Sequence, residues 1–190
     1  GLHLAPIGGS DDHRGGMGMG SFDSAIGSPT TMVFAAGLDP ASIVDGVRKG
    51  HTVVKLQGPD DPMIDLRIGD GLVGDTVIAH AAPIRITVTG GQGTTLVLLE
   101  SGKEQASVEV TSDPFEWTGT ASGGRYRAEV RVDGKPRTVT ANLWMDAPVT
   151  PPPSACGCST LDGWPLLGLL LLPRRRGGLR RLFALPPRTP

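Results

Sequence analysis

The stretch RYRAEVRVDG, residues 125–134, alternates apolar and charged side chains and ends in a turn dipeptide. Its apolar residues, from Tyr126 to Val132, fall on one side of an extended chain, and the charged residues fall on the other. A period of two is typical of a strand with one buried face. Asp133-Gly134 favours a tight hairpin into the next strand. The stretch therefore predicts antiparallel β structure around it.

Similar strand patterns recur between Met63 and Ala147. Short runs of apolar or alternating residues are separated by Gly, Asp-Gly or Asp-Pro turns. We predict an antiparallel, immunoglobulin-like β-sandwich over residues 63–147, with Trp117 and Trp144 in its core or at its edge. The other candidate strands are residues 84–89, 95–99, 107–111 and 137–143.

Before Met63, the sequence predicts a helix from Asp39 to Lys49 that is followed directly by a strand. Asp39 can cap the helix, Pro40 suits its first position, and Gly50 suits a left-handed exit. A strand at residues 52–56 follows. This order fits the end of a β/α barrel, and it equally fits a free-standing αβ corner. The apolar stripe of the helix consists of Ile43, Val44 and Val47.

Near the start of the chain, Asp11 and His13 follow an apolar run at residues 2–7. Residues two apart in an extended segment point to the same side, so this carboxylate and imidazole could hold one cation. Asp12 would point the other way. Ser and Asp between glycines are also ordinary turn chemistry, so a plain turn is the alternative.

Residues 9–13, Gly-Ser-Asp-Asp-His, resemble the last metal-binding motif of PHP-type metallohydrolases, and more narrowly their CehA/McbA-like branch. His51 stands where that branch usually has an arginine, in a turn between its final helix and strand. The segments that carry the rest of the resemblance are residues 26–34, 39–54, 125–130 and 141–144.

The resemblance implies an α+β chain whose residues 1–62 are the terminal piece of a distorted (β/α)7 barrel. Asp11 and His13 would be ligands in a two- or three-metal cluster of zinc, manganese or iron. Asp12 and Arg14 would orient His13 or meet an anionic substrate group. The implied reaction is hydrolysis of a small-molecule phosphoester or related ester by a metal-activated water.

Most ligands of such enzymes, including a His-x-His pair, lie upstream of this last motif. The chain has four histidines and no His-x-His, and it begins with Gly. We therefore expect it to be the C-terminal portion of a longer hydrolase and to be inactive alone, and we assign no catalytic residue. The alternative from another class is a non-catalytic, envelope-anchored β-sandwich binding module.

Charge separates the body of the chain from its tail. Residues 1–155 carry 12 basic and 18 acidic residues, and the remaining residues carry six arginines and one acid. An acidic body argues against nucleic-acid binding. The sequence does not indicate an oligomeric state.

Residues 148–190 form a segment whose composition differs from that of the rest of the chain. Residues 148–160 are a proline-rich linker that contains Cys156 and Cys158, and residues 161–190 are a short hydrophobic segment with an arginine-rich tail. This order resembles a MYXO-CTERM sorting tag, which a sorting protease at the membrane cleaves near the cysteine. It implies export to the cell envelope and anchoring at the outer surface.

The apolar segment of the tail is short for a membrane span. About 12 residues give roughly 18 Å of helix, against a hydrocarbon core of about 30 Å. The alternative is a disordered, arginine-bearing tail.

Overall fold

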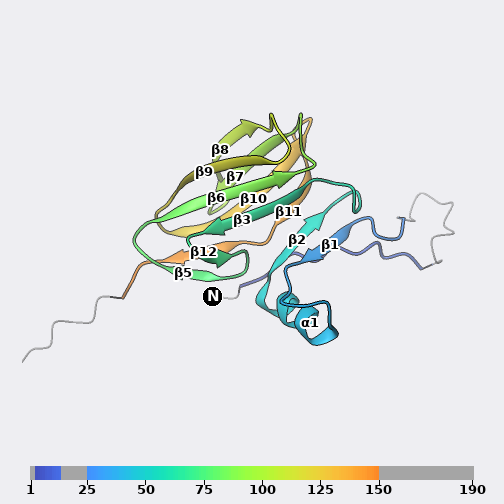
Figure 1. Ribbon diagram of the computed structural model, residues 1–190, viewed down its shortest axis with the longest axis horizontal. Helices are drawn as coiled ribbons and strands as arrows, with labels where there is room; N and C mark the ends of the chain where they lie inside the picture. Colours follow the sequence, from blue (N-terminus) through green and yellow to red (C-terminus); the bar gives the residue numbers. More distant parts are fainter. Residues whose placement is uncertain (1–2, 14–24, 150–190) are drawn as a thin grey trace, which may run out of the picture. The chain divides into compact units, whose positions relative to one another are not determined.

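Two β-sheets and one helix make up the computed structural model, which describes residues 3–13 and 25–149 (Figure 1). The helix, α1, spans Pro40–Lys49. The strands are β1 (Thr30–Val33), β2 (Thr52–Lys55), β3 (Met63–Ile68), β4 (Gly71–Leu72), β5 (Thr76–Ile78), β6 (Ala82–Thr89), β7 (Thr95–Glu100), β8 (Lys103–Glu109), β9 (Phe115–Ala121), β10 (Gly124–Val132), β11 (Lys135–Thr140) and β12 (Leu143–Asp146).

The larger sheet, sheet A, is built around β10. Along one edge β10 pairs with β7, which pairs with β8; along the other it pairs with β11 and β12. Strand β11 continues through β2 to β1, and β12 continues to β5. All these pairs are antiparallel except β5 with β12, which is parallel, so sheet A is mixed.

The smaller sheet, sheet B, has the order β4-β3-β6-β9 and is antiparallel throughout. Its inward residues alternate with polar ones, as the sequence predicts for a sheet with one buried face. Sheets A and B share one core, to which β3 and β6 contribute three buried residues each and β10 contributes Tyr126, Ala128 and Val130.

The hairpin predicted at Asp133-Gly134 is confirmed. Both residues have positive φ, 50° and 74°, as a type I′ turn requires, and Val132 pairs with Lys135 across it. Glycine at the second position adopts this conformation without a Cβ clash. The turn therefore sets the register of the first two pairs of β10 and β11, and the register shifts by one residue between Arg131 and Val130.

Tyr126 closes the corner between β9 and β10. Its side chain is 2% exposed, and its Oη accepts a hydrogen bond from the Ser122 N–H at 3.2 Å. The same corner occurs in immunoglobulin-type sandwiches, where it joins the two sheets at one end. Here it fixes the crossing from sheet B to sheet A.

The predicted helix is confirmed together with its caps. Asp39 Oδ1 accepts from the Ser42 N–H at 3.0 Å, Pro40 begins the helix, and Gly50 ends it in the left-handed region. The Ser42 hydroxyl and N–H bonds hold the pKa of Asp39 below its ordinary value. Gly46 is the one helical residue that is fully buried, because its Cα packs against β1.

The predicted α+β class, with a (β/α)7 barrel end in residues 1–62, is wrong. Of the described residues, 49% lie in strands and 7% in the helix, and no barrel is present among them. Strands of a β/α barrel run parallel with helical crossovers. Here β1 and β2 pair antiparallel, and β2 then pairs antiparallel with β11, so both belong to the sheet that holds β10.

Candidate functional site

Residues 3–8 contact strands β12 and β2 of sheet A. The His3 ring stacks on the Trp144 ring of β12, with centroids 3.9 Å apart and an interplanar angle of 3°. The Thr52 hydroxyl of β2 donates to the Pro6 carbonyl at 2.9 Å. These two contacts fix the segment at both ends without making it a strand.

Gly8 is where the segment comes closest to the sheet. The Thr31 hydroxyl accepts from the Gly8 N–H and donates to the Gly8 carbonyl, both at 2.8 Å. A Cβ on Gly8 would lie 2.7 Å from Val54 Cγ1, so only glycine fits this approach. The chain that carries Asp11 and His13 therefore leaves the sheet from a fixed point.

Asp11 and His13 lie together, but not for the reason that the sequence suggested. Residues 3–12 form no strand, and Asp11 has a positive φ of 52°. A turn, rather than strand alternation, brings His13 Nε2 to 3.9 Å from Asp11 Oδ1. Both side chains are exposed, at 81% and 93% for His13 and Asp11.

The hydrogen bond of His13 sets which of its nitrogens can bind a cation. His13 Nδ1 lies 2.7 Å from the Asp11 carbonyl oxygen. A carbonyl only accepts, so Nδ1 carries a proton, and in the neutral ring Nε2 presents its lone pair. Histidines that bind metals usually donate their other ring N–H in this way. Two bonds of about 2.1 Å at a tetrahedral angle separate their ligand atoms by about 3.4 Å, close to the observed 3.9 Å.

The described residues supply only these two donors at this place. Among residues 3–13 and 25–149, no group of three or more His, Cys, Asp or Glu side chains lies close enough to hold a metal ion. A catalytic zinc has three protein ligands. Asp12 neighbours the pair in sequence, and Arg14 lies outside the described residues. The two donors fit part of a metal site, and no catalytic step follows from them alone.

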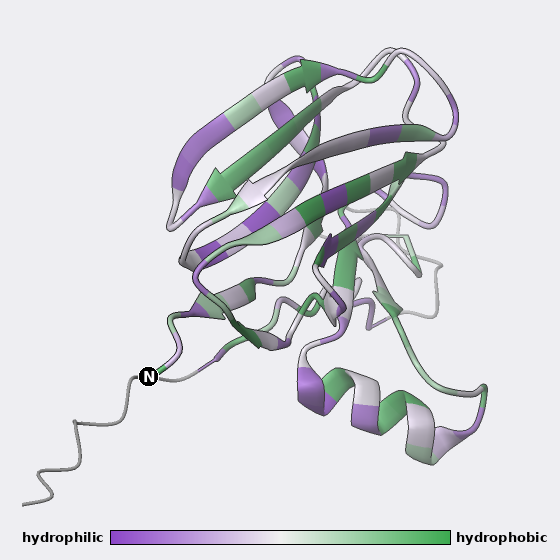
Figure 2. Cartoon of the chain, turned by 60° about the vertical axis from the view of Figure 1, so that its left-hand side comes forward, coloured by the Kyte–Doolittle hydropathy of each residue, from purple (hydrophilic) through white to green (hydrophobic). Residues whose placement is uncertain are grey.

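An apolar patch lies beside this segment and along α1. The apolar stripe of α1 is not covered by the sheets: Ile43 and Val44 are 39% and 45% exposed. Leu4 and Ile7 are also exposed, and they line a hollow of about 220 Å³ together with Val47. In Figure 2 the ribbon of α1 carries hydrophobic positions, in green, interspersed with hydrophilic ones, in purple. We call these five residues the apolar patch.

His51 follows α1 and contacts a carboxylate. Its Nε2 donates to Asp75 Oδ1 at 2.9 Å, and the Leu72 N–H donates to Asp75 Oδ2 at the same distance. Burial alone would raise the pKa of Asp75, but the Leu72 and His51 bonds outweigh it and hold the pKa below its ordinary value of 3.8. The pair joins the end of α1 to the turn between β4 and β5.

Acid is therefore expected to remove a part of the stability that Asp75 provides. A carboxyl whose pKa falls on folding stabilises the protein above its ordinary value of 3.8, and this contribution disappears as the pH falls through the lower, folded pKa. Asp75→Asn should lower the denaturant midpoint by more at about pH 7 than at about pH 3. An equal deficit of the variant at both pH values would contradict the assignment.

The outer face of sheet B carries a hollow that is lined largely by charged and polar residues. Its volume is about 540 Å³, and Asp65, Arg67, Arg85 and Glu116 line it. Arg67 Nε donates to Asp65 Oδ1 at 3.0 Å, whereas Arg85 lies directly opposite Arg67 and makes no ion pair with the described residues. No sequence motif distinguishes these residues, although alternation along the strands places them all outward.

Predictions for the tail concern residues that the structure does not describe. Cys156, Cys158 and the segment 161–190 lie outside the described ranges. Within those ranges, no helix is both long enough and apolar enough to cross a membrane.

Comparisons with known proteins identify no family. The sequence matches no protein-family model and no curated protein. One similar structure is a chimeric titin Z1Z2 carrying a decorin peptide: 14% identity, 46% of this chain and 97% of that chain covered, TM-score 0.31. Another is an engineered protein, with 17% identity, 47% and 21% coverage, and a TM-score of 0.30. Similarity this low supports no argument about fold or function.

Proposed function

We propose that this chain is part of a metal-dependent hydrolase of the PHP type, to which Asp11 and His13 contribute metal ligands. The observation that carries the proposal is the geometry of the pair: His13 donates through Nδ1 to the Asp11 carbonyl, and its Nε2 lies 3.9 Å from Asp11 Oδ1. An imidazole held in this tautomer beside a carboxylate is prepared to bind a divalent cation.

The remaining ligands would come from residues outside those described. The apolar patch supports this part of the proposal. An amphipathic helix whose apolar stripe faces solvent normally buries that stripe against another element. The patch adjoins residues 3–8, which lead to Asp11, so a partner domain that covered it would also lie near the pair.

Bound zinc, manganese or iron would lower the pKa of a water and stabilise the charge that develops on a phosphoester or related ester. In this chain, Asp11 and His13 would bind the metal, and Thr31 and Thr52 would hold the segment that carries them. Asp12 and Arg14 remain candidates for orienting His13 or meeting an anionic substrate.

The tail motif suggests where in the cell the proposed hydrolase would act. Cysteine, apolar segment and arginines in the order of a sorting tag would take the hydrolase to the cell envelope, with cleavage near Cys156 or Cys158 leaving it anchored at the outer surface.

Hydrolysis by the complete protein encoded by the reading frame that contains this chain tests the proposal. We expect turnover of p-nitrophenyl phosphate or p-nitrophenyl acetate that a chelator abolishes and that added zinc or manganese restores. Asp11→Ala and His13→Ala should each lower the rate by at least about 100-fold, because removing a ligand disturbs a metal more than altering its outer contacts.

Asp60→Ala and His80→Ala are the matched controls. Both residues are exposed and make no side-chain hydrogen bond or ion pair with the described residues, so their rates should equal that of the wild type. Metal-dependent turnover that is the same in all four variants would remove the assignment of Asp11 and His13.

A non-catalytic, envelope-anchored binding module is the second candidate. The charged hollow of about 540 Å³ on sheet B favours it, because a concave surface with unpaired charges can hold a polar ligand. Metal dependence distinguishes the two candidate functions. A binding module would still bind its ligand after chelation and after Asp11→Ala.

A further inference from the structure

A bulge interrupts sheet A where β10 passes from β12 to β11. Glu129 pairs with Val139 and Tyr126 pairs with Leu143. Between these pairs β10 has two residues, 127 and 128, while the facing chain has three, 140 to 142. One extra residue on one strand is a β-bulge, which redirects nearby side chains.

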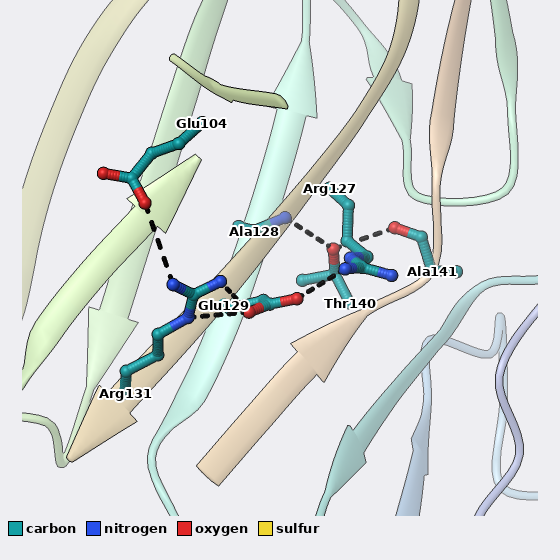
Figure 3. A network of polar contacts seen from close by, with 7 residues as sticks. All are labelled: Glu104, Arg127, Ala128, Glu129, Arg131, Thr140 and Ala141. Atoms are coloured by element: carbon teal, nitrogen blue, oxygen red, sulfur yellow. Dashed lines mark hydrogen bonds and ion pairs between the residues drawn. The ribbon is translucent and has the colours of Figure 1, made fainter. Parts of the chain in front are cut away.

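Thr140 satisfies the backbone that the bulge leaves unpaired. Its hydroxyl accepts from the Ala128 N–H at 3.0 Å and donates to the Ala141 carbonyl at 2.8 Å (Figure 3). Thr140 is fully buried. The bulge is therefore a hydrogen-bonded part of the fold, and Asn142, its last residue, lies off the regular ladder.

A hollow of about 240 Å³ lies beside the bulge on the outer face of sheet A. Arg125, Arg127 and Asn142 supply its polar lining, and Leu99 and Gly102 complete it. The arginines alternate with Tyr126, which points into the core, so both face outward. No carboxylate lines the hollow.

The carboxylate of β10 already accepts hydrogen bonds from two arginines. Glu129 is 5% exposed, and its Oε2 accepts from Arg131 Nε and Nη2 at 2.8 and 2.6 Å. Its Oε1 accepts from Arg127 Nη2 at 2.6 Å (Figure 3). Arg131 also lies 3.7 Å from Glu104. These two acids face three arginines, 125, 127 and 131, so positive charge remains at the hollow.

Several donors at the hollow have no acceptor among the described residues. Arg127 Nε is buried without a hydrogen-bond partner, and no other buried side-chain nitrogen or oxygen in the described ranges is in that state. The side chains of Arg125 and Asn142 make no hydrogen bond or ion pair with described residues. Buried donors without acceptors are rare in folded proteins and call for an explanation.

We propose that this hollow binds a sulfate or phosphate group between Arg125 and Arg127. Guanidinium groups match the geometry of such oxyanions, and Asn142 adds an amide donor. The hollow is large enough for the anion and part of an attached molecule, so free phosphate and a phosphate ester are the two sources to distinguish. The proposal does not depend on the proposed hydrolase, because it uses neither Asp11 nor His13.

Calorimetric titration of the whole 190-residue chain tests this site. Inorganic phosphate and glucose 6-phosphate are titrated separately at constant ionic strength, into wild type, Arg125→Gln and Lys135→Gln. Lys135 is an exposed cation of β11 whose side chain makes no hydrogen bond or ion pair with described residues, so it controls for the loss of one surface charge. Arg125→Gln should keep the unfolding midpoint of the wild type, since its side chain makes no bond that the fold requires.

We expect at least one of the two ligands to bind the wild type and Lys135→Gln equally. Arg125→Gln should bind it at least about tenfold more weakly, because a charge-assisted hydrogen bond is lost. Binding of inorganic phosphate alone identifies a free anion as the ligand, and tighter binding of glucose 6-phosphate identifies an ester. Absence of binding to the wild type, or equal binding by Arg125→Gln and Lys135→Gln, would overturn the proposal.

Discussion

Gly74→Ala is expected to lower the free energy of unfolding by about 2–5 kcal/mol, combining backbone strain with overpacking. Gly74 has a φ of +95°, and a Cβ there would lie 2.2 Å from the Lys49 carbonyl oxygen and 2.6 Å from the Gly50 carbonyl carbon. Both contacts are with backbone, which cannot rotate away. The end of α1 or the turn that contains Gly74 would have to move.

Gly93→Ala separates the cost of a left-handed backbone conformation from the cost of a steric clash. Gly93 has a similar φ of +83°, but no atom lies within 4 Å of the position of its Cβ. This variant should lose only about 1–2 kcal/mol, the cost of a left-handed conformation with a side chain. The measurement is urea unfolding of both variants. If the two lose equal stability, the close approach between Gly74 and the end of α1 is not present in solution.

Asp61→Ala is expected to lower the free energy of unfolding by about 3–5 kcal/mol, as removing one partner of a buried ion pair does. The Asp61 side chain is 1% exposed. Its Oδ1 accepts from Arg137 Nε at 2.8 Å and also from Arg137 Nη2, and its Oδ2 accepts from the Gln57 N–H at 2.7 Å. The variant would leave the guanidinium, which is 31% exposed, without its acid and the Gln57 donor without its acceptor.

The neighbouring aspartate provides the control for this variant. Asp60 is exposed and makes no side-chain bond with described residues, so Asp60→Ala should change stability by no more than about 0.5 kcal/mol. Chemical denaturation of the two variants side by side measures the difference. Identical midpoints would show that the link between the loop before β3 and strand β11 contributes nothing.

Local patterns predicted the elements that depend on nearby residues. The helix caps at Asp39 and Gly50 and the hairpin at Asp133-Gly134 were read from residues within a few positions of each other, and the structure confirms them. The alternation of Ile84, Ile86 and Val88 likewise identified the buried face of β6.

The pairing of β2 could not be predicted in this way. A helix followed by a strand has the same local pattern at the end of a barrel and beside an antiparallel sheet. The choice is made by distant contacts: Val54 pairs with Val139, and Asp61 bonds to Arg137. No local pattern carries this information, so the barrel prediction failed.

The candidate sites show the same limit. The sequence placed Asp11 and His13 at a useful spacing, but the turn that joins them depends on the positive φ of Asp11 and on the anchored segment before it. The hollow beside Arg125 and Arg127 depends on the bulge at residues 140–142, and that bulge exists only because β11 and β12 both pair with β10.

Metal analysis of the complete protein tests the central claim most directly. Wild type, Asp11→Ala and His13→Ala are purified in parallel with Asp60→Ala and His80→Ala, and bound zinc, manganese and iron are counted per chain. We predict that both site variants lose at least one ion that the wild type and both controls retain. Equal metal content in all five proteins would contradict the assignment of this carboxylate and imidazole as ligands.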